Sequence, residues 1–341
     1  MKGLTELKKV EIISLGEALV DRLGPLGGDS FEETLSEDYL GGAPANVASA
    51  LANLGINVAF ISRLGSDKIG QSFLDLLSSR NINLQGLQFD STLPSRTVLV
   101  KRDPTGDRSF HGFAGNKDNV FSDQMLNLSE LQSIWSSISL KAKWLVIGTI
   151  PLANEISSET YLWTIDMALK QGIKIALDIN WRPKFWDLNL PPSSGPNKSM
   201  LKTIFPVLMK ASLLKLSYEE AIWFFDTSNP LEISMRFQKK PDVIVTNGAN
   251  AINWCFEGFV GKTLPISGIP VFDTTGAGDA FISGLLYQLF IKKTQTSLLK
   301  DFEKMVEFAS CCGAIVCQSA GAIDPQPTLK EVNLFQSTFF N

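Results

Sequence analysis

The sequence contains little cysteine and almost no histidine. Its 341 residues include four cysteines and a single histidine, His111, and no two cysteines form a Cys-x-x-Cys pair. Structural zinc sites are built from Cys and His ligands at such short spacings, so a site of this kind has poor support. We interpret the cysteines as small apolar residues in the core of a protein from a reducing compartment.

The sequence also lacks long basic runs and long apolar runs. The net charge is -4, from 31 basic and 35 acidic residues, and no extended basic stretch occurs. A nucleic-acid-binding surface is therefore not expected. The most apolar stretches, such as residues 144–153, are too short to span a bilayer. The N-terminus carries no apolar segment of the kind found in signal peptides. We expect a cytoplasmic protein that binds neither nucleic acid nor membrane.

Short apolar runs alternate with segments of helical periodicity along most of the chain. The expected strands are 10–15, 57–61, 144–148, 174–179 and 243–247, and the expected helices are 40–54, 70–79, 157–172, 281–290 and 302–317. This alternation predicts a mainly parallel sheet covered by helices on both faces. The hydrophobic content of 44% allows a large core. No linker divides the chain, so we expect a single domain over residues 1–341.

One segment departs from this rhythm. Residues 96–113 are rich in β-branched residues and contain Asp103-Pro-Thr-Gly106, which is typical of a turn. The pattern predicts a β-hairpin. Because its surroundings alternate strand and helix, we assign the hairpin to a small sheet beside the main one. Residues 187–200, rich in Pro, Ser, Gly and Asn, are expected to form an exposed loop.

The strongest local signal is the run Asp273-Thr-Thr-Gly-Ala-Gly-Asp279. Gly276, Ala277 and Gly278 leave the backbone bare where a helix begins, so their N–H groups and the helix dipole can attract an anion. Asp279 falls in the first turn, where it can accept a proton from a hydroxyl during phosphoryl transfer. The alternative is a glycine turn followed by an Asp that only complements the helix dipole.

Two further places offer polar groups near the first strand. Gly42 opens a helix that carries Asn46, whose amide both donates and accepts hydrogen bonds. Asp21 follows the first strand and can accept bonds from two hydroxyl groups. A tight turn before a packed helix and a solvated carboxylate are the alternatives for these two places.

Two more candidates follow later strands. Asp178, Asn180 and Arg182 stand at alternate positions, so we expect them on one face beyond a strand's carboxyl end. An Arg–Asp pair in a loop is the alternative. Ser217-Tyr-Glu-Glu220 joins a strand to a helix, and Glu220 suits Mg²⁺ bound through water. A capping box between Ser217 and Glu220 is the structural alternative, and both can hold together.

Taken together, these motifs resemble the ribokinase family of sugar kinases, also called the PfkB family. The resemblance runs in order from about residue 10 to residue 327, with 273–279 similar to the C-terminal signature and 41–46 to the N-terminal one. It implies a ribokinase-like three-layer α/β/α fold with a mainly parallel central sheet. It also implies a small β-sheet lid formed by residues 18–40 and 94–115.

The resemblance implies a role for each matching residue. Asp279 would take the proton of the sugar hydroxyl, and the amides of Gly276, Ala277 and Gly278 would hold the transferring phosphoryl group. An ordinary Asp has a pKa of ~3.9, which suffices when the proton leaves late. The sugar would contact Asp21, Gly42, Asn46, Asn180 and Arg182. ATP would contact Lys215, Thr246, Gly248 and Thr275. The metal residues would be Glu220 for Mg²⁺ and Asp273, with Thr275, for a monovalent cation such as K⁺.

Two positions depart from the family pattern. Ser217 stands where an Asn is usual, and Ala251 replaces a glycine after the strand at 243–247. The run 16–21 resembles fructokinases, while 178–186 resembles a pattern that fructokinases share with 2-keto-3-deoxygluconate kinases.

The predicted activity is therefore ATP-dependent phosphorylation of fructose to fructose 6-phosphate. A 2-keto-3-deoxygluconate kinase and a non-catalytic regulatory protein of the same fold are the alternatives. Pairing of lid sheets would give a homodimer.

Overall fold

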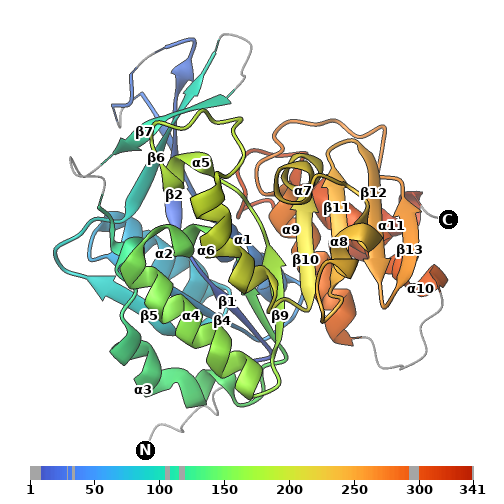
Figure 1. The fold of residues 1–341 in the computed structure, drawn as a ribbon. Helices are drawn as coiled ribbons and strands as arrows, with labels where there is room; N and C mark the ends of the chain where they lie inside the picture. Colours follow the sequence, from blue (N-terminus) through green and yellow to red (C-terminus); the bar gives the residue numbers. More distant parts are fainter. Residues whose placement is uncertain are drawn as a thin grey trace, which may run out of the picture.

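The computed structural model describes residues 9–28, 30–32, 35–103, 108–114, 120–291 and 299–339. Of the turn expected at 103–106, only Asp103 belongs to this part. The helices and strands below follow the labels of Figure 1.

A nine-stranded sheet forms the centre of the molecule (Figure 1), in the order β13-β12-β11-β10-β9-β8-β1-β4-β5. Its strands are β1 (Ile12–Leu15), β4 (Val58–Gly65), β5 (Asn83–Asp90), β8 (Trp144–Ile147), β9 (Lys174–Asp178), β10 (Leu213–Ser217), β11 (Asp242–Asn247), β12 (Asn250–Phe256) and β13 (Phe259–Thr263). All neighbours are parallel except for the two pairs that β12 makes. The predicted mainly parallel sheet is confirmed, and the antiparallel β12–β13 edge is an addition to it.

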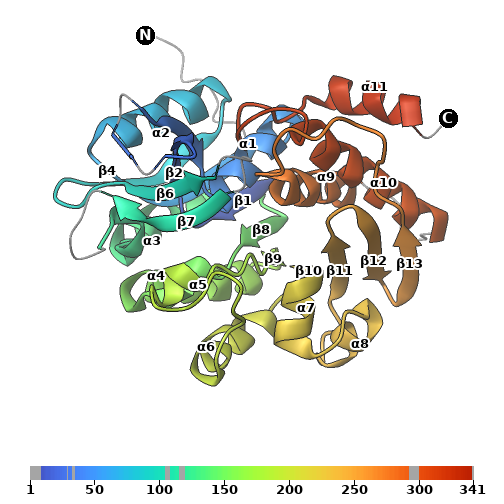
Figure 2. The same cartoon turned by 90° about the horizontal axis from the view of Figure 1, so that it is seen from above.

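Helices cover both faces of this sheet (Figure 2). On one face lie α1 (Ala43–Asn53), α2 (Lys68–Ser79), α9 (Ala277–Ile291) and α10 (Leu299–Val316), with α11 (Leu329–Phe339) outside α10. On the other lie α3 (Leu128–Ser139), α4 (Glu155–Lys170), α6 (Lys198–Leu208), α7 (Tyr218–Phe225) and α8 (Pro230–Met235). The short elements are η1 (Ser122–Gln124), η2 (Ile150–Ala153) and α5 (Pro183–Trp186). This is the three-layer α/β/α arrangement that the resemblance implied.

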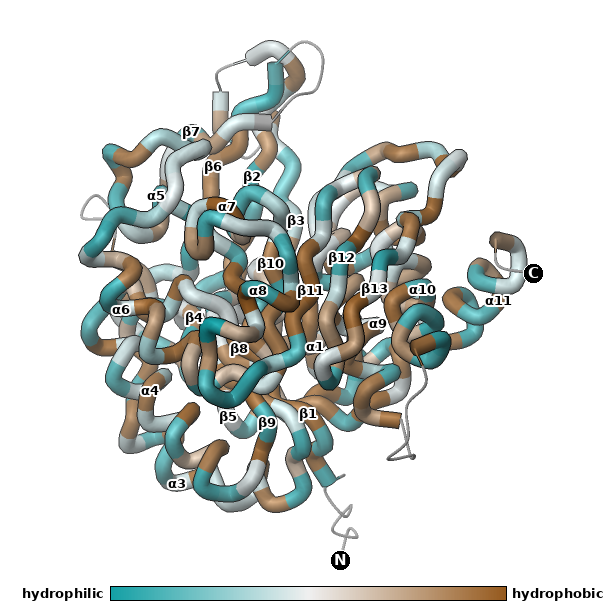
Figure 3. The backbone as a smooth tube through the Cα atoms, turned by 45° about the vertical axis from the view of Figure 1, so that its right-hand side comes forward, coloured by the Kyte–Doolittle hydropathy of each residue, from teal (hydrophilic) through white to brown (hydrophobic). Residues whose placement is uncertain are grey.

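The central strands read as continuous apolar runs because both of their faces are buried. Ile12 and Val146 pack with the α1, α2, α9 and α10 layer, whereas Ile13 and Ile147 pack with the layer of α3, α4, α6, α7 and α8. Figure 3 shows the apolar residues gathered along the central strands. The cysteines are free, and three of them, Cys255, Cys311 and Cys312, are buried as expected. In the described part of the chain, no helix is both long and apolar enough to cross a membrane.

A second, four-stranded sheet stands above the carboxyl end of β1 (Figure 1), in the order β3-β2-β6-β7. Its strands are β2 (Leu19–Leu26), β3 (Glu37–Gly41), β6 (Arg96–Arg102) and β7 (Arg108–Ala114). We call it the small sheet. The predicted hairpin is its antiparallel β6–β7 pair. Only residues 16–18 separate β1 from β2, so the chain passes directly from the central sheet into the small sheet.

The loop expected over residues 187–200 is shorter than predicted. Asn197 caps α6, because its side chain accepts the N–H groups of Ser199 and Met200. The helix therefore begins at Lys198, inside the expected loop. An Asn at the end of a loop-forming sequence is an N-cap signal that the sequence interpretation did not use.

Candidate active site

The glycine-rich run at 273–279 leads into α9, as predicted. The helix begins at Ala277 and carries Asp279 in its first turn. Gly276 has a φ of 77°, and a Cβ at this position would lie 2.6 Å from the Cβ of Ala322. No other residue fits both this backbone conformation and this close approach.

Asp273 holds the turn in shape. Its Oδ1 accepts the N–H and the hydroxyl of Thr275 at 2.9 and 2.7 Å, and its Oδ2 accepts the N–H of Gly321 at 3.0 Å. The buried carboxylate thereby ties the start of α9 to the loop around Gly321. These bonds leave only part of its oxygen surface for a cation.

Two of the three amides predicted for the anion hole are available to a ligand. Among the described residues, the N–H groups of Gly276 and Gly278 have no acceptor, whereas that of Ala277 donates to the carbonyl of Thr274 at 3.2 Å. The N-terminus of α9 adds a partial positive charge beside these amides. An anion is therefore best held by Gly276 and Gly278, with a lesser share for Ala277.

Asn46 reaches across from α1 to Asp279. Its Nδ2 donates to Asp279 Oδ2 at 2.7 Å. The buried Oδ1 of Asn46 has no hydrogen-bond partner among the described residues. An unpaired buried acceptor is costly, so this oxygen is suited to receive a hydroxyl from a ligand beside Asp279.

Gly42 makes this placement of Asn46 possible. It is the N-cap of α1 and has a φ of 97°. A Cβ there would lie 2.7 Å from the carbonyl oxygen of Glu17. The glycine thus lets the start of α1 pack directly against the chain that leaves β1.

The environment of Asp279 makes it a stronger base than an ordinary Asp. Although the residue keeps some exposure to a pocket, burial of its carboxyl group raises its pKa to about 6. The hydrogen bond from Asn46 opposes this shift, the charge of Asp178 adds to it, and the charges of Lys215 and Arg182 oppose it. At pH 7 the group is mostly ionised yet basic enough to take a proton.

A buried ion pair lies beside the N-terminus of α9. Lys215 of β10 and Asp178 of β9 are partners in the parallel ladder, and their side chains meet with Nζ–Oδ2 at 2.7 Å. A Cβ on Gly278 would come 3.0 Å from Lys215 Nζ, so the ammonium group lies against the free amides. Burial lowers the pKa of Lys215, but the charges of Asp178 and Glu220 outweigh burial and raise it. The lysine stays charged next to the anion site.

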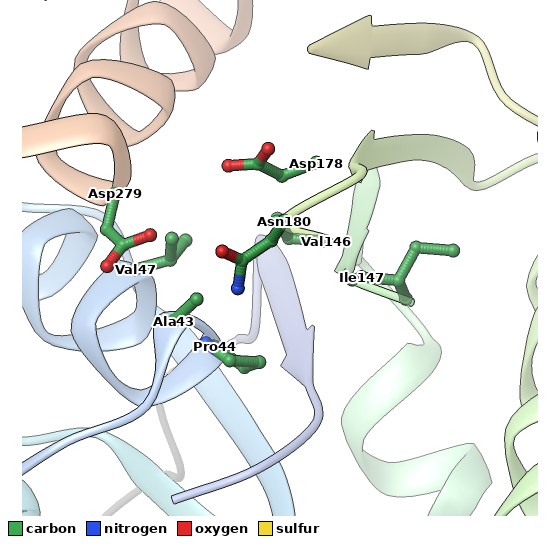
Figure 4. A pocket seen from close by; sticks show the side chains of 9 residues that line it. Ala43, Pro44, Val47, Val146, Ile147, Asp178, Asn180 and Asp279 are labelled. Atoms are coloured by element: carbon green, nitrogen blue, oxygen red, sulfur yellow. The ribbon is translucent and has the colours of Figure 1, made fainter. Parts of the chain in front are cut away.

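A pocket opens between these residues (Figure 4). Asp178, Asn180 and Asp279 all line it, from the end of β9 and from α9, and Figure 4 shows their polar groups turned toward the same space. Of the three residues expected on one face beyond the strand, Asp178 and Asn180 share this pocket, whereas Arg182 does not line it. The strand ends at Asp178, and Asn180 has a left-handed φ of 42°. Arg182 is exposed, and Trp181 O accepts from its guanidinium at 3.1 Å.

Glu220 forms the predicted capping box. Its Oε2 accepts the N–H of Ser217 at 2.7 Å, and its own N–H donates to the Ser217 hydroxyl. Its Oε1 accepts the N–H of Trp181 at 2.6 Å. With both oxygens so engaged, the carboxylate fits Mg²⁺ only through water. The described residues contain no cluster of three or more acidic, His or Cys side chains that would hold a metal directly.

The other predicted nucleotide residues lie at the end of β11. The hydroxyl of Thr246 donates to the carbonyl of Leu216 at 3.3 Å, and Gly248 follows with a φ of 52° and open space where a side chain would be. Ala251 is the second residue of β12, where an extended backbone suits alanine. The departure from glycine at this position therefore needs no change in the path of the β11–β12 hairpin.

The small sheet brings Asp21 toward the same region. The residue lies in β2, between Tyr39 of β3 and Val98 of β6. A Cβ on Gly41 would lie 3.2 Å from Asp21 Oδ2. The carboxylate therefore reaches the backbone that leads into Gly42 and α1.

One acidic residue near the site was missed by sequence reasoning. Glu17, between β1 and β2, is only 4% exposed, and burial raises its pKa to about 8. The available signal was a single carboxylate between Gly16 and the apolar residues that follow it. An acidic side chain at such a place is either exposed or functionally unusual.

Free amides at a helix N-terminus, a basic carboxylate and a buried lysine meet at the carboxyl ends of a parallel sheet. This arrangement defines an α/β phosphotransferase. Residues 10–329 match the family model of the pfkB family carbohydrate kinases, which is built from the sequences of its members. The chain belongs to this family.

Curated and solved relatives agree with this family. "Probable fructokinase-7" of Arabidopsis thaliana is 32% identical over 337 residues, covering 96% of this chain and 93% of the relative. A Vibrio cholerae fructokinase with fructose, ADP and calcium ion is similar with a TM-score of 0.79 and 27% identity, covering 96% of this chain and 99% of that one. A Xylella fastidiosa fructokinase with ATP has a TM-score of 0.79 and 25% identity, covering 96% and 98%.

Proposed function

We propose that the protein phosphorylates fructose at its 6-hydroxyl with ATP as the phosphoryl donor. One observation carries the proposal: Asp279 is held by Asn46 beside Lys215 and the open amides of α9. A base for a hydroxyl and a site for a phosphoryl group thus adjoin within a carbohydrate kinase. The relatives named above are all called fructokinases, which supports fructose as the acceptor.

The chain's residues divide the work of the transfer. The unpaired Oδ1 of Asn46 orients the hydroxyl, and Asp279 accepts its proton as the oxygen attacks the γ-phosphorus. The amides of Gly276 and Gly278 and the ammonium group of Lys215 balance the negative charge of the phosphoryl oxygens. The bond from phosphorus to ADP breaks as the bond to the sugar oxygen forms.

The remaining sugar contacts come from both sheets. Asp21 on the small sheet and Asn180 at the pocket are proposed to bind the other hydroxyl groups, while Gly42 lets the sugar approach the backbone. Arg182, exposed near the pocket, is proposed to close over the ligand. We also propose that the small sheet acts as a lid, because excluding water favours transfer to sugar over hydrolysis.

Metal ions are assigned to two places. The fit of Glu220 to Mg²⁺ through water supports a site beside the nucleotide phosphates, where the ion would neutralise charge. Asp273 and Thr275 are proposed to contribute to a monovalent cation site, such as one for K⁺, through the oxygen surface that their mutual bonds leave. Thr246 and Gly248 are proposed to contact ATP at the end of β11.

Three broader predictions accompany this function. The chain is proposed to act as a single domain over residues 1–341. Its location is proposed to be the cytoplasm. A homodimer paired through edge strands β3 or β7 of the small sheets is the proposed assembly.

Steady-state assays with a panel of sugars test the proposal. ADP formation with ATP and fructose, 2-keto-3-deoxygluconate, ribose or glucose is measured, and the product is identified by NMR. Fructose is expected to give the highest kcat/KM, with phosphate on the 6-hydroxyl.

Each other outcome selects a different function. Faster turnover of 2-keto-3-deoxygluconate would replace the proposed substrate, with Arg182 as the partner of its carboxylate. Transfer to no sugar at all would favour the non-catalytic regulatory protein.

A further inference from the structure

Glu17 lies at the joint between the two sheets. It follows Gly16 at the end of β1 and precedes β2 by one residue, Ala18. Its carbonyl oxygen and the Cα of Ala18 pack against Gly42, at 2.7 and 3.1 Å from where a Cβ would be. The start of α1 therefore fixes the backbone at this joint.

The side chain of Glu17 enters a polar pocket. The pocket lies between Arg96 and Asp123, at the base of the small sheet, and the segment from η2 into α4. Glu17 is 4% exposed, and its Oε2 has no hydrogen-bond partner among the described residues. This carboxyl oxygen is thus enclosed by the described part of the protein without a hydrogen-bond donor.

The arginine that lines this pocket, Arg96, is already paired. Arg96 makes two bonds to Asp123, at 2.8 and 2.9 Å, and both side chains are 4% exposed. Its guanidinium also lies over the rings of Phe113, Phe121 and Phe185, at 4.8, 4.5 and 4.9 Å from their centroids. An ionised Glu17 would be buried without an ion-pair partner in the pocket, which is far more costly than a neutral one.

We propose that Glu17 is a positioning residue of the sugar site: as a neutral carboxylic acid, it holds the joint between the small sheet and the central sheet beside Asp279. The proposal rests on the proposed function, since the small sheet carries Asp21 to the sugar. A neutral acid lines the pocket without adding negative charge near the base. An ionised one would draw water into the joint and loosen the small sheet over the sugar.

The charged surroundings of Glu17 support a neutral state. Burial raises its pKa to about 8, an effect that its own backbone N–H opposes. Asp123 of η1 and Asp279 of α9 raise the pKa further, and Arg182 lowers it. Tyr161 of α4 is fully buried, and burial raises its pKa, with a smaller contribution from the charge of Glu17. The neutral form therefore holds below about pH 8 and is lost as the pH rises through that value.

The test compares Glu17→Gln with the parent and with Glu307→Gln. Burial also raises the pKa of Glu307, but that residue lies on α10, away from the pocket. We measure kcat and KM for fructose from pH 6.5 to 9.5, and fructose binding by calorimetry at both ends. In the parent and in Glu307→Gln, sugar affinity is expected to fall by up to about tenfold per pH unit above the pKa. In Glu17→Gln the affinity should stay level over this pH range, with kcat/KM at pH 7 within about threefold of the parent, because the neutral amide has nearly the same shape as the neutral acid.

Several results would overturn the proposal. One is a folded Glu17→Gln variant whose fructose affinity still falls at alkaline pH as in the parent. Another is a fall in kcat/KM of more than about a hundredfold at pH 7, which would mean that an ionised carboxylate is required. If Glu17→Gln does not fold, Glu17→Met must give the same level pH profile. If the parent binds fructose with this pH dependence but transfers no phosphoryl group, the proposed function fails and the role of Glu17 stands. If the parent binds no sugar, the proposed function and the role of Glu17 both fail.

Discussion

The two sides of the active site are built in different ways. On the α9 side, Asp279 is bonded to Asn46 and Lys215 to Asp178, each at 2.7 Å, and these residues come from the central sheet and its helices. On the sugar side, Asp21 is half-buried and belongs to the small sheet, which residues 16–18 join to β1 and residues 91–95 join to β5. The residues proposed for phosphoryl transfer are thus held by the central sheet and its helices, whereas binding of the sugar depends on the position of the small sheet. Variants on the first side should lower kcat, and variants on the second should raise KM.

The largest effect is expected for Asp279→Asn. Without an acceptor for the hydroxyl proton, kcat should fall by about 10³-fold, while KM for fructose changes little. Stopped-flow and steady-state assays measure the two constants. Asp301→Asn, in the first turn of α10, is the matched control and should keep parental activity. Equal losses in both variants would mean that Asp279 only complements a helix dipole.

Lys215→Met should lower kcat by about 10²-fold, because one donor to the phosphoryl oxygens is lost. It also leaves Asp178 buried without a partner, which costs about 3 kcal/mol of unfolding free energy. Adding Asp178→Asn should restore stability in chemical denaturation but not kcat. Recovery of the rate in the double variant would show that Lys215 acts only through the ion pair.

Asp21→Ala should act on the other side of the comparison. Loss of charge-assisted bonds to hydroxyl groups should raise KM for fructose by about tenfold or more, with kcat within a few fold of the parent. Asp38→Ala serves as control, since Asp38 lies on the same sheet but pairs with Arg22 at 2.7 Å on the surface. A fall in kcat alone for Asp21→Ala would contradict the division between the two sides.

The smallest expected effect is a shift in the acid limb of the pH profile. Asp279 accepts a proton only when ionised, so kcat/KM should fall as the pH drops below about 6. The bond from Asn46 lowers the pKa of Asp279, so Asn46→Ala should move the midpoint to higher pH. The pH profile of kcat/KM measures this, and a midpoint that moves to lower pH would contradict the assigned direction.

Features that depend on neighbouring residues were predictable from the sequence. The glycine turn before Asp279, the capping box of Ser217 and Glu220, and the β6–β7 hairpin are all present. Each rests on backbone preferences over a few residues. The N-cap at Asn197 was missed although it is local, because the composition of the loop before it masked the signal.

Features that join distant segments were not predictable in the same way. Asn46 and Asp279 lie 233 residues apart, and the resemblance assigned both to the sugar without a bond between them. The pairing of Lys215 with Asp178 follows from the register of β10 on β9, which the sequence pattern does not define. The raised pKa of Asp279 follows from this assembly rather than from its own motif.

By itself, the sequence determined the alternation of strands and helices, the bare helix start before Asp279 and the family to which the chain belongs, since periodicity and turn chemistry are local. Only the tertiary structure decided that Asn46 supports the base, that Lys215 lies against Gly278 and that Glu17 is enclosed at the joint of the two sheets. Burial and charge act through space, so they appear only when distant segments pack together.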